Sequence, residues 1–380
     1  MRALVYNGPK DVSVQDVPDA RIEDPNDAVV RITTTNICGS DLHMYEGRTS
    51  VQPGKTLGHE NMGIVEEVGP GVSRLKPGDR VSLPFNIGCG HCRNCQGGRT
   101  AFCTEVNPGF AGGAYGYADM GPYPGGQAQF LRVPWADWNA LRLPPGTEHE
   151  LDFTMLSDIL PTGWHGTRLA GLRPGDSCLV IGAGPVGLMA ALSALTQGAS
   201  QVFVVDEKQD RLKLAEQICA TPVDFTDQPA TDFVMDATSG RGVDCGVEAV
   251  GFQAHSPDGQ EMPDQTLQTL VDCVRATGGI GVIGLFVAQD PQGVDDVHAK
   301  GNAVFPFGSF FTKEQSIGTG QANVKDYNRQ LRDLIIHDRI SPSWIVSQEL
   351  SLEQASEGYD KFDQRLDGWT KVVLHPDAAR

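Results

Sequence analysis

The chain has 380 residues and a formal net charge of -18, with 48 acidic against 30 basic side chains. Its 40% hydrophobic and 21% charged content is that of a globular protein, and its length allows two domains with separate cores. The negative charge argues against nucleic acid and anionic membrane surfaces as partners, because their phosphates would be repelled.

The first 160 residues carry short alternating segments separated by Gly and Pro, which predicts a β-rich domain. The expected strands are ALVYN, VSVQDV, AVVRITTTNIC, MGIVEEVG, DRVSLPF and AQFLRVP. The first of them lacks the apolar stretch of a secretion signal, so we expect a cytoplasmic protein.

From residue 177 the pattern changes to strand, glycine turn, long apolar helix and strand, read as SCLVI, GAGPVG, LMAALSALTQ and QVFVVD. Strand-like runs at 242–251 and 278–286 follow, with a helix-like segment between them. This alternation predicts an α/β fold with a doubly wound parallel sheet. The terminal TKVVLHP is a strand that we expect to rejoin the first domain. The predicted domains are therefore 1–160 with 315–380, and an inserted 161–314.

Residues 177–205 contain no charged side chain, a run long enough to cross a bilayer. Gly182, Gly184, Pro185 and Gly187 interrupt it early, and QGASQ interrupts it again. A strand, a turn, a buried helix and a second strand explain the run better than a membrane helix does.

The turn Gly182-x-Gly184-x-x-Gly187, which includes Pro185 and Val186, follows an apolar strand and opens an apolar helix. Such glycines let a pyrophosphate approach the backbone at a helix N-terminus. Asp206 ends the next strand, where a carboxylate can bond ribose hydroxyls and would repel a 2′-phosphate. The sequence thus predicts an NAD site, the alternative being a purely structural turn.

Four of the nine cysteines fall close together, as Cys89, Cys92, Cys95 and Cys103. Four thiolates at these spacings can close a tetrahedron around zinc and leave no open position, which is typical of a structural site. An iron–sulfur cluster, a redox CxxC pair and unmetallated cysteines are the alternatives. The iron–sulfur spacing differs at the last gap. The dispersed remaining cysteines indicate a reducing compartment.

Two further segments, NICGSDLHMYEG and LGHENMG, contain residues that bind metals or transfer protons. These are Cys38, Ser40, Asp41, His43, His59 and Glu60. Each alone has an ordinary structural interpretation, such as a buried cysteine or a core histidine. Their combination ahead of a cysteine cluster and a nucleotide fold favours a second metal site.

Over essentially its whole length the chain resembles the zinc-dependent medium-chain dehydrogenase/reductase family. Within it, the chain is most similar to the glutathione-independent formaldehyde dehydrogenase and formaldehyde dismutase branch. The resemblance rests on NICGSDLHMYEGRT, LGHENMG, LPFNIGCGHCRNC, AGGAYGYADMGPYPGGQAQF and LSDILPTGWHG. It implies a β-rich, GroES-like catalytic domain with an inserted Rossmann-type domain.

The resemblance also implies the catalytic zinc ligands, which are Cys38, His59 and Asp158. Asp158 stands where liver-type alcohol dehydrogenases have cysteine, and the formaldehyde branch has aspartate there. Carboxylate oxygen binds zinc well, and three ligands leave a position for substrate. The alternative is that Asp158 caps the helix that follows.

The remaining roles come from the same resemblance. Asp41 would orient His59, Glu60 would lie behind the metal, and Ser40 would accept the substrate proton. His43 would be the outer proton carrier, reached through the cofactor ribose. Phe85 would form a pocket wall, Thr162 would pack against nicotinamide, and Lys371 would lie near the pyrophosphate. Residues 251–266 match an insertion that covers the adenine side of the cofactor.

The implied reaction moves a hydride from an alcohol or an aldehyde hydrate to NAD, with two zinc ions per chain, one catalytic and one structural. Formaldehyde is mainly a hydrate in water, so it fits as a substrate. The alternatives are a general alcohol or polyol dehydrogenase, and a non-catalytic NAD-binding protein with a structural zinc only. The family resemblance also implies a homodimer or homotetramer.

Overall fold

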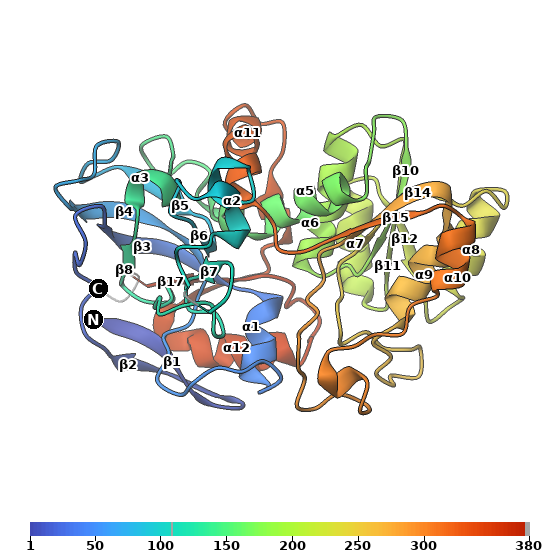
Figure 1. The fold of residues 1–380 in the computed structure, drawn as a ribbon, viewed down its shortest axis with the longest axis horizontal. Helices are drawn as coiled ribbons and strands as arrows, with labels where there is room; N and C mark the ends of the chain where they lie inside the picture. Colours follow the sequence, from blue (N-terminus) through green and yellow to red (C-terminus); the bar gives the residue numbers. More distant parts are fainter. Residues whose placement is uncertain (108, 377–380) are drawn as a thin grey trace. The chain divides into compact units, whose positions relative to one another are not determined.

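The computed structural model describes residues 1–107 and 109–376, and it divides into two compact units (Figure 1). One comprises Met1–Pro161 with Asn323–Arg380, and the other Thr162–Ala322. The first boundary falls within helix α5 (Ile159–Leu169). The return lies later than the expected residue 315, because β15 (Ser316–Thr319) pairs with β14 in the sheet of the second unit.

The first unit is rich in antiparallel strands, and its main sheet has the order β16-β17-β3-β4-β5-β9, with β8 paired to β3. The hairpin β1–β2 and the pair β6–β7 stand apart from this sheet. The strands are β1 (Arg2–Gly8), β2 (Asp11–Asp16), β3 (Ala28–Ile37), β4 (Glu60–Val68), β5 (Arg80–Leu83), β6 (Asn86–Ile87), β7 (Gly113–Ala114), β8 (Phe130–Val133), β9 (Leu141–Arg142), β16 (Gln348–Ser351) and β17 (Val372–His375). The helices are α1 (Gly39–Tyr45), α2 (Arg93–Gln96), α3 (Ala136–Asn139), α4 (Glu150–Thr154), α11 (Val324–Ile336) and α12 (Ala355–Asp363).

The second unit is a parallel sheet in the order β12-β11-β10-β13-β14-β15. Its strands are β10 (Ser177–Ile181), β11 (Gln201–Asp206), β12 (Thr221–Asp224), β13 (Val243–Glu248), β14 (Val274–Val282) and β15. Its helices are α6 (Pro185–Thr196), α7 (Gln209–Gln217), α8 (Ala230–Ala237), α9 (Gln265–Cys273) and α10 (Phe307–Thr312). The helices α6 and α7 cover one face of the sheet, and α8, α9 and α10 cover the other (Figure 1).

Burial on both faces explains why the strands of the second sheet read as continuous apolar runs. Leu179, Phe203 and Ile280 on three different strands are fully buried in one core cluster. Within the part of the chain that the structure describes, no helix combines the length and apolar character needed to cross a membrane. The uncharged run 177–205 is instead a strand, a turn, a buried helix and a strand, as the sequence predicts.

The strand order reverses between β10 and β13, which lie side by side although other elements separate them in sequence. In doubly wound folds, ligands bind beyond the carboxyl ends of the strands at such a reversal. The glycine turn follows β10 at this point. Gly182 has a φ of +99°, which favours glycine, and a Cβ at Gly187 would lie 1.8 Å from the Gly182 carbonyl oxygen.

We therefore expect Gly187→Ala to destabilise the second unit by about 1–3 kcal/mol or more, because the added methyl group overlaps backbone. Gly184→Ala is the matched control. Gly184 has a φ of -65°, and a Cβ there meets no atom within 4 Å. Its effect on unfolding free energy should stay within about 1 kcal/mol. Urea unfolding measures both, and equal midpoints for the two variants would contradict this account of the turn.

Candidate metal centres and dinucleotide turn

Cys89, Cys92, Cys95 and Cys103 lie together in the first unit with their thiols buried. The Cys92 and Cys103 sulfurs are 3.8 Å apart. Two ligands of a tetrahedral zinc with Zn–S of 2.3 Å should be separated by roughly 3.8 Å. The donor set and its spacing therefore fit a closed zinc site.

Backbone hydrogen bonds in this loop favour the thiolate of Cys92, whereas burial raises the pKa of the Cys89 and Cys95 thiols. The Cys89 N–H donates to the Cys103 sulfur at 3.3 Å, the Cys92 N–H to the Cys89 sulfur at 3.3 Å, and the Cys95 N–H to the Cys92 sulfur at 3.4 Å. Burial raises the pKa of the Cys92 thiol, but donated hydrogen bonds outweigh it and bring that pKa to about 6. Trp138 packs against the loop. A Cβ added at Gly90 would lie 2.9 Å from its ring.

A half-buried lysine from α11 lies near the same cluster. Lys325 donates from Nζ to the Asn86 carbonyl at 2.8 Å. Burial lowers its pKa to about 8, while the nearby Cys95 and Cys103 favour its charged form. A zinc with four thiolates carries two excess negative charges, and this ammonium group offsets part of them.

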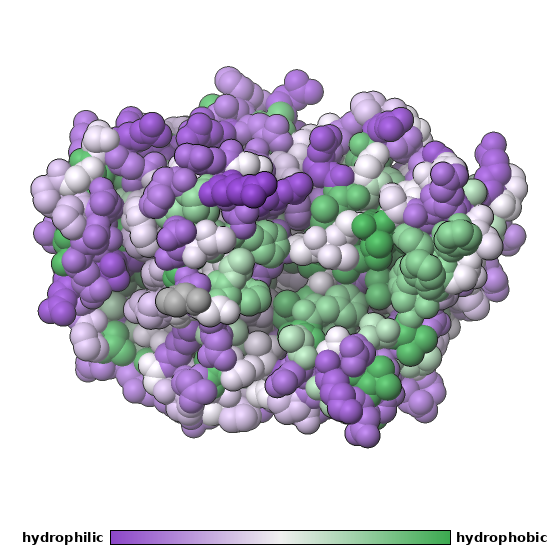
Figure 2. All heavy atoms as spheres, viewed as in Figure 1, coloured by the Kyte–Doolittle hydropathy of each residue, from purple (hydrophilic) through white to green (hydrophobic). Residues whose placement is uncertain are grey.

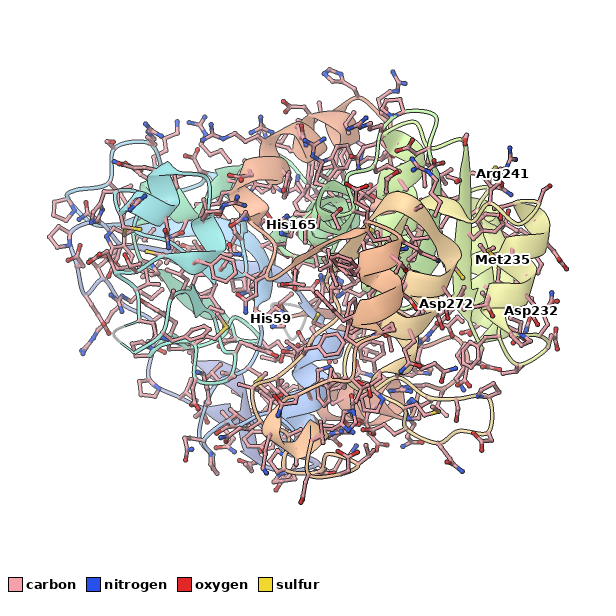
Figure 3. The ribbon with its side chains drawn as sticks, turned by 45° about the vertical axis from the view of Figure 1, so that its right-hand side comes forward. His59, His165, Asp232, Met235, Arg241 and Asp272 are labelled. Carbon is pink, nitrogen blue, oxygen red and sulfur yellow. The ribbon has the colours of Figure 1, made fainter. Side chains whose placement is uncertain are left out.

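The second group, also in the first unit, comprises Cys38, His59, Glu60 and Asp158, and the predicted ligands Cys38, His59 and Asp158 have exposed fractions of 4%, 2% and 7%. Asp158 Oδ2 lies 3.8 Å from Cys38 Sγ and 3.2 Å from His59 Nε2. Figure 3 labels His59 beside the N-terminal, blue elements. For a tetrahedral zinc these ligand separations should be roughly 3.6 and 3.3 Å, so the three atoms fit one ion with a position left open.

Asp41 fixes the orientation of the His59 ring. Its Oδ1 lies 3.0 Å from His59 Nδ1, and its Oδ2 accepts from the Cys38 backbone N–H at 3.0 Å, where α1 begins. The ring therefore turns Nε2 toward Asp158. Burial opposes protonation of His59, but Asp41 and Asp158 outweigh it and hold the ring's pKa well above its usual value. These carboxylates favour positive charge at Nε2, and a divalent cation meets the same requirement.

Ser40 and His43 lie on α1, which begins directly after the candidate zinc ligand Cys38. Ser40 Oγ is 3.3 Å from His59 Nε2, so the hydroxyl lies at the edge of the three-ligand group. His43 is buried at 9% exposure one helical turn later. Thr162 is buried near the start of α5 and belongs to the second unit.

The dinucleotide turn in the second unit holds Pro185 at the first turn of α6, which leaves the N–H groups of Val186 and Gly187 directed out of the helix end. Asp206 Oδ2 accepts from the Ala183 N–H of this turn at 2.7 Å. Its Oδ1 accepts from the backbone N–H groups of Glu207 and Lys208 at 2.8 and 2.9 Å. The carboxylate thus lies at the turn, with further lone pairs to accept from hydroxyl groups.

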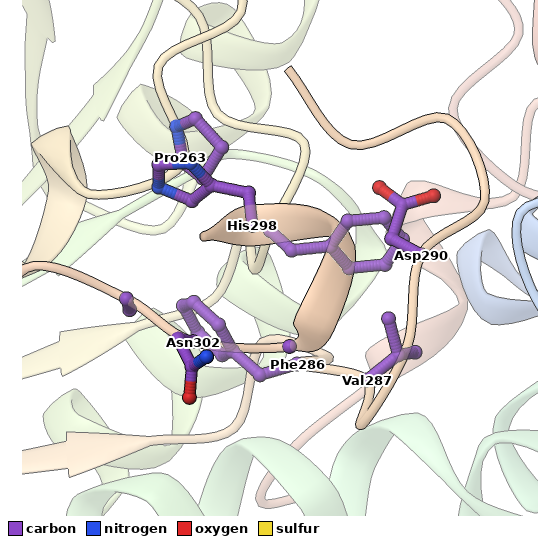
Figure 4. A pocket seen from close by; sticks show the side chains of 9 residues that line it. Pro263, Phe286, Val287, Asp290, His298 and Asn302 are labelled. Carbon is purple, nitrogen blue, oxygen red and sulfur yellow. The ribbon is translucent and has the colours of Figure 1, made fainter. Parts of the chain in front are cut away.

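A small cavity lies in the same unit among the loops that follow β13 and β14 (Figure 4). Phe252, Pro263 and Phe286 give it apolar walls, and His298 closes one side. His298 bridges two carboxylates, Asp295 at 2.8 Å and Asp264 at 3.1 Å. The bridge ties residues 295–298 to Asp264, directly before α9.

Comparison with known proteins shows the family to which the chain belongs. Residues 24–145 match the family described as Alcohol dehydrogenase GroES-like domain, and residues 185–327 match that described as Zinc-binding dehydrogenase. The chain is 45% identical to the glutathione-independent formaldehyde dehydrogenase of Pseudomonas aeruginosa, over 99% of this chain and 97% of the relative. The chain belongs to the zinc-dependent medium-chain dehydrogenase/reductase family.

Two other similarities cover the dehydrogenase from end to end. It is 40% identical to the formaldehyde dismutase of Pseudomonas putida, over 99% of this chain and 97% of the relative. The solved structure of an alcohol dehydrogenase from Thermus sp. ATN1 matches it with a TM-score of 0.87 at 37% identity, covering 99% of both chains. The GroES-like and Rossmann-type fold expected from the sequence is therefore confirmed.

Lys371 has a partner within the first unit that the sequence did not predict. Its place near the pyrophosphate, which the family resemblance implies, stays a prediction; in the dehydrogenase its side chain is fully enclosed, with 0% exposure. Its Nζ lies 2.6 Å from Glu60 Oε1 and donates to the Ile37 carbonyl at 3.2 Å. Glu60 Oε2 accepts from Asn36 Nδ2 at 2.7 Å. Because each Glu60 oxygen already has a partner, Glu60 is better explained as the neighbour of the metal group than as a ligand.

Two aromatic rings hold His59 from the sides. Phe85, the expected pocket wall, is edge-on to the His59 ring at a centroid distance of 6.1 Å. Tyr117 is also edge-on, at 5.5 Å, and its side chain is buried. Sequence reasoning missed Tyr117, although it lies in AGGAYGYADMG, a segment that carries the resemblance to the formaldehyde branch.

We expect Lys371→Met to cost about 3–5 kcal/mol, because it leaves the Glu60 carboxylate buried without its counter-charge. Combining it with Glu60→Gln should recover most of that loss, since the amide needs no cation. Chemical denaturation of the single and double variants measures this coupling. A double variant no more stable than Lys371→Met would show that the ion pair is not what Lys371 contributes.

Proposed function

We propose that the chain oxidises an alcohol-level carbon with NAD, using zinc at Cys38, His59 and Asp158, and that formaldehyde hydrate is its favoured substrate. The observation that carries the proposal is this buried sulfur, nitrogen and oxygen set, whose separations suit a zinc ion with one position open. The names of the two formaldehyde-converting relatives support the choice of substrate.

We assign different roles to the two metal groups of the described residues. The four-cysteine group offers four sulfurs and so leaves no place for substrate, which makes it structural. The three-ligand group would be catalytic. Two zinc ions per chain follow from this assignment.

A zinc ion in the open site would act as a Lewis acid and lower the pKa of the substrate hydroxyl. Asp41 keeps His59 Nε2 directed at the site through its 3.0 Å contact with Nδ1. Ser40 Oγ, 3.3 Å from that nitrogen, is placed to accept the hydroxyl proton. His43 lies buried on the same helix, and an imidazole is suited to carry the proton onward.

The second unit would hold NAD, which accepts the hydride. The N–H groups at the start of α6 can bind the pyrophosphate, and the glycines of the turn leave room for it. The Asp206 carboxylate favours ribose hydroxyls over a 2′-phosphate. Thr162 remains our candidate for contact with nicotinamide, and Phe85 for the pocket wall.

Formaldehyde hydrate carries two hydroxyl groups on one carbon, so it is an alcohol with respect to hydride loss. Oxidation of the hydrate gives formate, whereas oxidation of a simple alcohol stops at the aldehyde. A general alcohol or polyol dehydrogenase is the second candidate, and the similarity to the Thermus alcohol dehydrogenase favours it.

We also propose that the enzyme is cytoplasmic and forms a homodimer or homotetramer. Apolar side chains gather on the surface around α10 (Figure 2), where Phe307 and Phe311 are 65% and 74% exposed. The adjacent β15 ends the parallel sheet, and its Ile317 is exposed. Exposed edges and apolar patches of this kind are typical of protein interfaces.

Cys38→Ala should abolish turnover by removing one zinc ligand, while the unfolding temperature stays near that of the unchanged protein. Cys95→Ala should instead lower the unfolding temperature or prevent soluble expression, because it opens a closed site. Metal analysis should find two zinc ions per unchanged chain and one in Cys38→Ala. Cys219→Ala, at an exposed cysteine, is the control for loss of a thiol. Full hydride transfer by Cys38→Ala would reject the catalytic assignment.

NADH absorbance with formaldehyde and a panel of alcohols, each with and without glutathione, tests the substrate. We expect kcat/KM to be highest for formaldehyde and unaffected by glutathione. Loss of aldehyde without net NADH would indicate dismutation, with the cofactor reoxidised by a second aldehyde. A higher kcat/KM for polyols or longer alcohols would favour the second candidate.

A further inference from the structure

Glu248 is a carboxylate in the second unit that the proposed chemistry does not use. It is the last residue of β13 and is fully buried, with 0% exposure. Its backbone partner across the sheet is Ile181, the last residue of β10. It therefore ends its strand at the reversal of strand order, where the glycine turn also begins.

One oxygen of this carboxylate shapes the loop after β13. Glu248 Oε1 accepts from the Val250 N–H at 2.9 Å and from the Gly251 N–H at 2.8 Å. The start of this loop lies against the glycine turn. The Ala249 N–H donates to the carbonyl of Ile181, the residue directly before Gly182, at 3.0 Å. A Cβ at Gly182 would lie 2.8 Å from the Val250 side chain.

The same residue also reaches the loop after β14. The Glu248 carbonyl accepts from the N–H groups of Ile283 and Gly284, each at 3.0 Å. A Cβ at Gly284 would lie 2.1 Å from Glu248 Oε2, so glycine leaves the space that the carboxylate fills. The two loops then meet directly, since Phe252 donates to the Leu285 carbonyl at 3.0 Å.

From these contacts we infer that Glu248 is a positioning residue for the dinucleotide, which holds the loops 249–252 and 283–286 in register with the glycine turn. The inference rests on the proposed NAD-linked function. The Val250 and Gly251 N–H groups bind its carboxylate, and the Ile283 and Gly284 N–H groups bind its carbonyl. Its neighbour Ala249 bonds to Ile181, directly before the glycine turn. Phe252 and Phe286, which line the cavity in Figure 4, extend from the two loops it joins.

The carboxylate occupies this edge despite the cost of burying it. Burial raises the pKa of Glu248 and so disfavours the ion, whereas the N–H groups of Gly251 and Val250 favour it. An apolar side chain would avoid the cost of burial but would leave both N–H groups without an acceptor. The loop geometry therefore depends on the Glu248 oxygen as a hydrogen-bond acceptor.

The test is the equilibrium Kd of NADH, measured by fluorescence on the full-length, zinc-loaded protein. Glu248→Ala should raise this Kd roughly tenfold or more, because the loops lose their common acceptor. Glu248→Gln should bind within about threefold of the unchanged protein, since its amide oxygen can accept the same two N–H groups. In steady state, Glu248→Ala should raise the KM for NAD more than it lowers kcat.

Asp244→Ala is the matched control, at the opposite end of the same strand. Asp244 accepts from the Ser177 N–H and hydroxyl, both at 2.8 Å, and pairs with Arg275. Its loss should lower the unfolding temperature while the Kd of NADH stays unchanged. If Asp244→Ala weakened NADH binding as much as Glu248→Ala, the effect would be one of stability and the inference would fail.

Hydrogen exchange separates this inference from the proposed function. Glu248→Ala should speed amide exchange in 249–252 and 283–286 without cofactor present, and Glu248→Gln should not. Unchanged exchange in Glu248→Ala would overturn the inference even if the unchanged protein binds NADH. Failure of the unchanged protein to bind NADH would overturn the proposed function, and with it the role of Glu248 in positioning NAD.

Discussion

The first unit is organised around buried charge that must be balanced. Glu60, Asp41, Asp158 and Cys38 place acidic groups in the buried interior of this unit, and the Lys371 ammonium group forms an ion pair with Glu60. Isolated charges in such surroundings are strongly disfavoured, so positive charge at His59 Nε2, or a cation in its place, stabilises the arrangement. The buried acidic groups therefore favour the binding of a cation, and the three ligand atoms determine where it binds.

The two metal groups meet this constraint in different ways. Around the four cysteines, backbone N–H groups and the Lys325 ammonium stabilise the sulfurs from a short, self-contained loop. Around Cys38 the ligands come from separated segments, and the carboxylates of Asp41 and Asp158 orient the His59 ring. A loop of the first kind suits a permanent structural ion. In the second kind, the Glu60 carboxylate beside His59 already binds Lys371 and Asn36, which favours a coordination position left free for substrate.

Local patterns made much of this predictable. The glycine turn, the cysteine spacing and the change from alternating to continuous apolar strands each depend on residues close in sequence, so the fold class was accessible. The role of Lys371 was not, since its partner Glu60 is 311 positions away and nothing in TKVVLHP signals a buried ion pair. Tyr117 and Glu248 were missed for the same reason. Neither an aromatic residue in a glycine-rich loop nor an acidic residue at the end of a strand forms a sequence pattern that reveals its distant contacts.

The domain return was placed too early because β15 is too short and exposed to show strand periodicity.

The pairing of β17 with β3 has a consequence for synthesis on the ribosome. Lys371 directly precedes β17, which lies between β16 and β3 in the sheet and is synthesised after the whole of the second unit. The second unit is continuous and complete well before that point. Because domains tend to fold as units once they have been synthesised, the inserted unit can fold while the unit that surrounds it is still open. The ion pair between Lys371 and Glu60 can then form only after the second unit has been synthesised.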